Sequence, residues 1–288
     1  MPDQDPPPGP ADLRPPERIA EAATRAGVKK ATLDWPVLAV LGVLAGLYIG
    51  LGGLFSTVAL AGAEGAMPHG AARLLAGLAF SLGLVLVVVG GAELFTGNTL
   101  LVVAWAEDRA RLRDIGAAWA LAWGANLLGA LAAVGLALAA GVPAMGEGAV
   151  GAAALKAAQA KGALPFGQAF ASGVLANILV CLAVWMAWGA RSAADKVLVV
   201  VPPVAAFVAL NVEHSVANMA LIPLGWGVRA TADAGFWAAT GLSPAAFGEA
   251  GPGGLVANLV PVTLGNLLGG VMVGVAYWFA YLRPRPDG

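Results

Sequence analysis

Six long apolar stretches constrain the fold of this chain more than any other feature of its sequence. They cover residues 35–63, 74–106, 115–142, 166–190, 197–228 and 254–282. About 20 apolar residues in a helix are enough to cross a bilayer, and a helix satisfies its own backbone hydrogen bonds where water is absent. We therefore predict an all-α membrane protein with six transmembrane helices.

The composition agrees with a membrane location and excludes several other classes of protein. Of the 288 residues, 59% are hydrophobic and 11% are charged, whereas a soluble domain has about 25% charged residues. The net charge is −1 and no basic stripe is present, so we expect no nucleic-acid partner. The single cysteine, Cys181, excludes an intrachain disulfide, and no motif predicts a metal site or a cofactor.

The ends of the chain differ in composition from its apolar centre. Residues 1–16 are rich in proline and acidic residues, and we expect them to be disordered. Residues 17–33 alternate apolar and charged positions at helical spacing, which predicts a short helix on the cytoplasmic surface. Residues 34–283 form the predicted six-span membrane domain, and residues 284–288 form a short tail.

Lysine and arginine are distributed unevenly between the segments that connect the six stretches. Twelve of the 16 lie on the side that carries both termini, and the other side has Arg73, Lys156, Lys161 and Arg229. Because loops rich in Lys and Arg remain in the cytoplasm, both termini should be cytoplasmic. We expect a multi-pass protein of the cytoplasmic (inner) membrane.

The second and fifth stretches, at roughly 33 and 32 residues, are longer than one tilted helix needs. Each contains a polar cluster with the same spacing: Glu93 and Asn98 in the second, Glu213 and Asn218 in the fifth. Polar groups at bilayer depth are costly unless they face a cavity or one another. We predict that both helices are interrupted at these clusters.

A second match extends the similarity between the two halves of the chain. The third stretch contains Asn126-Leu-Leu-Gly-Ala, and the sixth contains Asn266-Leu-Leu-Gly-Gly. Since each copy has three spans, the two halves should be inverted repeats whose interrupted helices meet near the midplane. The two asparagines are expected to bridge helices or support the breaks. Glu93 and Glu213 are expected to accept hydrogen bonds from backbone groups that the breaks leave free.

The sequence resembles the formate/nitrite transporter family over residues 17–283. The resemblance rests on segments 92–98, 176–185, 213–219 with Ile222-Pro223, and 260–266. It implies an aquaporin-like protomer of six helices, a homopentamer with one pore per subunit, and passage of small monovalent weak-acid anions such as formate and nitrite.

The resemblance also implies roles for individual residues. A central His214 and Thr96, which lies in the break of the second span, would contact the anion, with Asn177 beside them. Lys161 would lie in the outer vestibule. The apolar constrictions would be Leu94, Phe95 and Phe207 on one side and Phe80, Leu84 and Val180 on the other. Without the resemblance, Lys161 would be a solvated loop residue and the six apolar residues would be ordinary core or lipid-facing side chains.

The chemistry of His214 fits the passage of a weak-acid anion. It is the only side chain in the predicted spans that titrates near neutral pH. It could donate a proton to the anion or hold it by a hydrogen bond, so protons are a second expected partner. The sequence leaves open whether transport is passive or coupled to protons, and whether formate, nitrite or hydrosulfide is the physiological substrate.

Alternatives from other functional classes agree less well with the residues. An aquaporin-like channel for water or small solutes also has inverted halves, but its paired Asn-Pro-Ala turns and an arginine at depth are missing. An intramembrane enzyme needs a second catalytic group, and the sequence has no His-Glu-x-x-His or Gly-x-Ser-x-Gly motif. We therefore expect no enzyme activity and no catalytic residue. A structural scaffold would leave the polar clusters unexplained.

Overall fold

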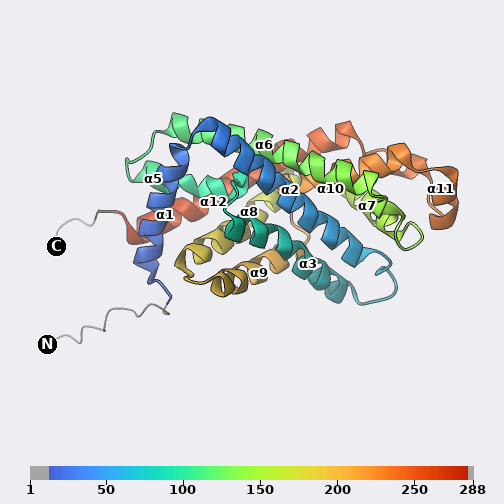
Figure 1. The fold of residues 1–288 in the computed structure, drawn as a ribbon, viewed down its shortest axis with the longest axis horizontal. Helices are drawn as coiled ribbons and strands as arrows, with labels where there is room; N and C mark the ends of the chain where they lie inside the picture. Colours follow the sequence, from blue (N-terminus) through green and yellow to red (C-terminus); the bar gives the residue numbers. More distant parts are fainter. Residues whose placement is uncertain (1–12, 285–288) are drawn as a thin grey trace.

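The computed structural model describes residues 13–284, and its regular elements within this range are all helical (Figure 1). Most of the predicted disordered tail, residues 1–12, lies outside the described residues, as do residues 285–288 of the predicted C-terminal tail. Helix α1 (Pro16–Ala31) covers most of the segment predicted to be a surface helix. α1 and the last turns of the final helix lie at one end of the molecule, and α7 (Ala149–Gly162) and α11 (Ala234–Thr240) lie at the other (Figure 1).

Five helices in the described range are long and apolar enough to cross a membrane. They are α2 (Trp35–Leu60), α3 (His69–Gly90), α6 (Leu112–Ala139), α8 (Phe166–Gly189) and α12 (Pro252–Tyr281). Leucine, alanine and valine dominate each of them, and many of these side chains remain exposed. Exposed apolar side chains on long helices are typical of surfaces that face lipid or another protein.

The second and fifth apolar stretches are each divided between helices at the predicted polar clusters. After α3, the chain continues as α4 (Phe95–Asn98), the 3₁₀ turn η1 (Thr99–Leu101) and α5 (Val102–Ala106). The fifth stretch consists of α9 (Ala193–Ala209) and α10 (Ser215–Thr231). Gly91 ends α3 in the left-handed conformation with φ 76°, and Asn211 follows α9 with φ 55°. Glycine and asparagine tolerate this conformation best, so the local sequence supports both breaks.

Helix α7 (Ala149–Gly162) was not predicted from the sequence. The solvated-loop role that Lys161 would have without the resemblance does not hold, because Lys161 lies in the last turn of α7 and its side chain is 14% exposed. Alanine, the strongest helix former, fills much of this segment. Its Ala154, Leu155 and Ala158 are buried in the core. Three shorter elements complete the described chain: η2 (Val142–Ala144), α11 (Ala234–Thr240) and η3 (Pro244–Phe247).

The repeated Asn-Leu-Leu-Gly segments lie where long helices make close backbone contacts. A Cβ atom on Gly129 of α6 would overlap the carbonyl oxygen of Val43 in α2. In the other half, a Cβ atom on Gly269 of α12 would overlap the carbonyl oxygen of Val174 in α8. Small residues allow the backbones of transmembrane helices to approach this closely. The motif glycine therefore has the same packing role in both halves.

This close contact predicts the effect of adding one methyl group. We expect Gly129→Ala to lower the free energy of unfolding by about 1–3 kcal/mol, because overpacking a tight contact costs about that much. Thermal unfolding of the purified protein in detergent measures the change. The matched control is Gly135→Ala, in the same helix, where the new Cβ has open space. Equal melting temperatures for the two variants would contradict this account of the contact.

Candidate functional site

The first break forms a cluster of one lysine, one carboxylate and one carboxamide. Lys30, near the end of α1, lies 2.9 Å from Glu93 Oε2 and donates a hydrogen bond of 2.9 Å to Asn98 Oδ1. Asn98 Nδ2 donates to Glu93 Oε2 over 2.9 Å. The Glu93 side chain is 8% exposed. A carboxylate at this depth needs such partners, because an unpaired buried charge is strongly destabilising.

The second break has the same arrangement, built from different helices. Lys161 of α7 lies 2.8 Å from Glu213 Oε1, and Asn218 Nδ2 donates to Glu213 Oε2 over 2.6 Å. Asn258 of α12 adds a further donor at 3.1 Å. Lys30 and Asn258 are not predicted as site residues from the sequence. A second carboxamide in the sixth apolar stretch, besides that of Asn266, is a usable signal for Asn258, whereas nothing in the sequence distinguishes Lys30 from the neighbouring cations.

Asn126 supplies the hydrogen bonds that the backbone loses at the first break. Its Oδ1 accepts from the Phe95 N–H over 2.9 Å, at the start of α4. Its Nδ2 donates to the Glu93 carbonyl over 3.0 Å and to the Gly42 carbonyl of α2 over 2.8 Å. One carboxamide therefore satisfies both sides of the break and joins it to a third helix.

Asn266 repeats this arrangement at the second break. Its Oδ1 accepts from the Ser215 N–H over 2.8 Å, and its Nδ2 donates to the carbonyls of Glu213 and Gly173 over 3.1 and 2.8 Å. The prediction that these asparagines support the breaks is confirmed. The prediction that the two glutamates accept from the backbone is wrong for residues 13–284, where their carboxylates accept only from side chains.

His214 and Thr96 meet in the interior, one from each break. The distance between His214 Nε2 and Thr96 Oγ1 is 2.8 Å, and the two residues are 2% and 0% exposed. His214 is also the N-cap of α10, where its Nδ1 accepts from the Ala217 N–H over 3.1 Å. Because Nδ1 accepts, a neutral ring has its proton on Nε2 and donates it to Thr96 Oγ1. No acceptor for the Thr96 hydroxyl proton is found in the described part of the chain.

Asn177 lies behind the Thr96 segment instead of next to the His214 ring. Its Nδ2 donates to the Thr96 carbonyl over 3.3 Å, to Thr99 Oγ1 over 3.1 Å and to the Asn266 carbonyl over 2.5 Å. These contacts connect the first break to α12, whose Asn266 supports the second break. Asn177 is fully buried and lines neither of the two cavities next to this site.

Two cavities approach the His214–Thr96 pair. The Lys161 cavity has a volume of about 380 Å³, and its lining includes Arg73, Phe80, Lys161, Phe207 and His214. The Lys30 cavity has a volume of about 480 Å³, and its lining includes Lys30, Leu84, Glu93, Leu94 and Gly97. The lining of the Lys161 cavity includes His214 itself, and the lining of the Lys30 cavity includes Gly97, the residue after Thr96.

The predicted grouping of the apolar constrictions is wrong. Phe80 and Phe207 pack edge to face with their ring centroids 5.2 Å apart, and both line the Lys161 cavity. Leu84 and Leu94 line the Lys30 cavity instead. The reason is helix geometry: Phe80 and Leu84 are four residues apart on one face of α3, so they lie about 6 Å apart in depth.

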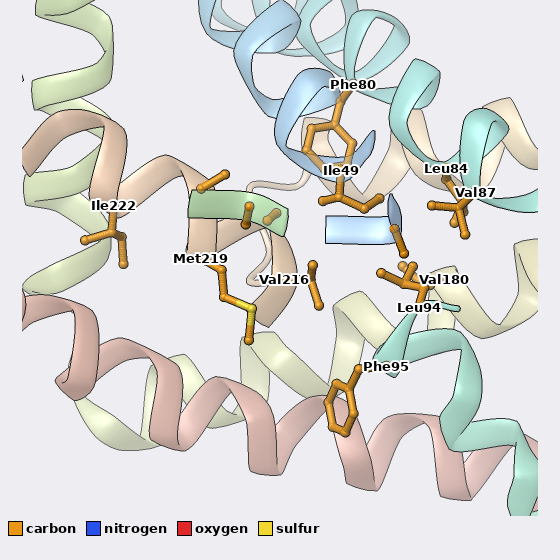
Figure 2. Close-up of a cluster of buried hydrophobic side chains, with 14 of the residues drawn as sticks. Ile49, Phe80, Leu84, Val87, Leu94, Phe95, Val180, Val216, Met219 and Ile222 are labelled. Atoms are coloured by element: carbon orange, nitrogen blue, oxygen red, sulfur yellow. The ribbon is translucent and has the colours of Figure 1, made fainter. Parts of the chain in front are cut away.

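The remaining two predicted constriction residues line neither cavity. Phe95 and Val180 belong to the same buried apolar cluster as Phe80, Leu84 and Leu94 (Figure 2). They are 4% and 2% exposed. In this structure they support the site from the core and do not face its open space.

Comparison with known proteins places this geometry in a family. The sequence model described as formate/nitrite transporter matches residues 17–279. The formate channel FocA of Escherichia coli (strain K12) is 42% identical over 276 residues, which cover 95% of this chain and 96% of the relative. The formate channel FocB of the same strain is 32% identical over 283 residues, 96% of this chain and 98% of the relative.

Solved structures give the same assignment. A pentameric formate channel with formate bound superposes with a TM-score of 0.79 at 41% identity, covering 86% of this chain and 98% of that chain. An FNT family ion channel superposes with a TM-score of 0.76 at 29% identity, covering 91% of this chain and 98% of that chain. These relatives are channels and transporters, not enzymes. The chain is therefore a multi-pass membrane protein that belongs to the formate/nitrite transporter family.

Proposed function

We propose that this protein transports formate through a pore in each protomer, and that the His214–Thr96 pair is the central contact of the anion. The observation that carries this proposal is the 2.8 Å contact between His214, which lines the Lys161 cavity, and Thr96, whose neighbour Gly97 lines the Lys30 cavity. The relatives named as formate channels, and the related structure with formate bound, support formate as the substrate. Nitrite, another small monovalent anion, is the second substrate we propose.

The proposed architecture is six spans in two inverted halves, as in aquaporins, assembled as a homopentamer in the inner membrane. The matched hydrogen bonds of Asn126 and Asn266 support the repeat, because each asparagine pairs with both sides of one break. A pentameric structure of 41% identity supports the assembly. The excess of positive charge on one side supports cytoplasmic termini, with residues 17–33 as a surface helix beside the 34–283 membrane domain.

The central pair lowers the barrier that a bare anion would meet in an apolar pore. A charge at the centre of a bilayer costs from about 2.5 to over 10 kcal/mol, depending on the reference state. The Thr96 hydroxyl proton is free to donate to the anion, while Thr96 Oγ1 accepts from His214 Nε2. A donor that is itself hydrogen-bonded in this way is polarised and binds an anion more strongly.

Hydrogen bonding explains the site better than proton donation by an imidazolium. A second proton on His214 would have to occupy Nδ1, which already accepts from the Ala217 N–H. That proton would remove the N-cap of α10 and direct two donors at each other. We propose that the ring stays neutral during passage, and that any proton that accompanies formate comes from solvent.

The role of the His214 imidazole in transport can be separated from its role as the N-cap of α10. Asparagine is a preferred N-cap residue, so His214→Asn keeps an acceptor for Ala217 but removes the imidazole. We expect formate uptake into proteoliposomes to fall by about twofold to tenfold, because Thr96 loses the hydrogen bond that polarises it and such a neutral bond is worth about 0.5–1.5 kcal/mol. His214→Ala should lose uptake and thermal stability together. Wild-type rates and pH dependence in both variants would refute the proposal.

The Thr96 hydroxyl gives an independent test with a matched control. Thr96→Val removes the hydroxyl and nearly keeps the side-chain shape, whereas Thr96→Ser keeps the hydroxyl. We expect Thr96→Val to reduce formate uptake by about tenfold to a hundredfold, the loss of one hydrogen bond to a charged group, and Thr96→Ser to retain most of it. Stopped-flow uptake measured at saturating formate compares them. Equal rates for valine and serine would remove the hydroxyl from the mechanism.

We expect the apolar residues that line the Lys161 cavity and those that line the Lys30 cavity to form two separate constrictions. Each should limit the size of the substrate independently of the other. Phe207→Ala opens the side of the Lys161 cavity and Leu84→Ala the side of the Lys30 cavity. We expect each to admit acetate or larger carboxylates at a higher rate than wild type, and the double variant to admit them fastest. Uptake of formate, nitrite, hydrosulfide, acetate and propionate measures the selectivity. Leu82→Ala, at an exposed position of the same helix as Leu84, is the control, and an unchanged selectivity in all variants would contradict this assignment.

A further inference from the structure

The Lys161 cavity contains three basic side chains, and two of them are neutralised by carboxylates. Lys161 pairs with Glu213 over 2.8 Å. Lys156 pairs with Glu64, which lies in the segment between α2 and α3. Each of these ion pairs has no net charge, so neither lysine gives the cavity a strong positive potential at a distance. The third basic residue is Arg73.

Arg73 has no carboxylate partner among residues 13–284. Its Nη2 donates to the Val208 carbonyl over 2.7 Å and to Asn211 Oδ1, and both acceptors are neutral. Its Nε is buried and makes no hydrogen bond. After the two ion pairs cancel, the guanidinium is the charge that remains on the lining of this cavity.

The position of the guanidinium relates it to the proposed site of transport. Val208 and Asn211 mark the end of α9 and the start of the break that leads to His214. Arg73 therefore lines the same cavity as His214 and the Phe80–Phe207 pair, and two contacts hold its side chain in place. An arginine that is fixed in this way keeps its charge and retains N–H donors that match the geometry of a carboxylate.

We propose that Arg73 is the residue that draws carboxylate anions into the Lys161 cavity and makes the cavity prefer them over neutral solutes. The inference rests on the proposed transport of formate and concerns how the anion is recruited. A cavity with one uncompensated charge and low-dielectric walls raises the local concentration of counter-ions and their rate of entry. The ion-paired lysines then shape the cavity without dominating its potential.

The test measures formate uptake by proteoliposomes over a range of formate concentrations. We expect Arg73→Gln to raise the half-saturating concentration by about tenfold, the lower end of known electrostatic steering effects, and to leave the limiting rate unchanged. Arg73→Lys should stay close to wild type. Arg229→Gln is the matched control, because it removes a positive charge in the last turn of α10 that does not line the cavity. It should leave uptake unchanged.

Ionic strength separates an electrostatic role from a structural one. Raising the concentration of an impermeant salt from about 0.01 M to about 1 M shortens the Debye length from about 30 to about 3 Å. Wild-type uptake at low formate should fall over this range, and uptake by Arg73→Gln should change little. Asn211→Ala removes a contact of the guanidinium but keeps the charge, so it should retain the salt dependence.

A gain-of-charge variant keeps the inference falsifiable if Arg73→Gln folds poorly. Glu64→Gln leaves Arg73 intact and frees the charge of Lys156 in the same cavity, so it should lower the half-saturating concentration. An unchanged value in Glu64→Gln, or wild-type saturation and salt dependence in Arg73→Gln, overturns the inference. So does an Arg73→Lys variant that behaves like Arg73→Gln. If wild-type protein takes up no formate at all, the proposed function itself has failed.

Discussion

The need to pair every backbone polar group inside an apolar protein governs the whole site. A break in a membrane helix frees N–H and C=O groups that no water can satisfy at that depth. Asn126 and Asn266 solve this problem in the same way, because each accepts from the first turn after its break and donates to the carbonyl before it. These hydrogen bonds fix the segments that present Thr96 and His214 to each other.

Charge at the two breaks follows a related rule. Glu93 and Glu213 are buried, and each is paired with a lysine from a different helix and with the asparagine five residues further on. Buried ion pairs add little net stability, but removal of one partner is strongly destabilising. The pairs are therefore best understood as devices that keep the local charge near zero. Arg73 has no carboxylate partner in the described part of the chain, so under the proposed arrangement its guanidinium influences the Lys161 cavity more than either lysine there.

The sequence predicts the parts of this design that depend on local spacing. The Glu-x4-Asn clusters indicate both helix breaks, and Asn126 and Asn266 indicate the supports, because each pattern lies within one apolar stretch. It does not predict that Glu213 pairs with Lys161, since these residues are 52 positions apart and no spacing in the sequence indicates how α7 packs against the second break. The four-residue spacing of Phe80 and Leu84 separates them in depth, but the cavity that each apolar residue lines depends on how the helices pack across the interior.

The His214 ring has a role in both the fold and the proposed function. Nδ1 caps α10 through the Ala217 N–H, and Nε2 donates to Thr96 across the site. The cap is available only while Nδ1 has no proton, so the same contact that starts the helix also selects the tautomer that faces Thr96. Charging the ring would weaken the first turn of α10 at the point where Asn266 holds the neighbouring Ser215 N–H. A neutral donor is therefore the state that satisfies both the backbone at the break and an anion at Thr96.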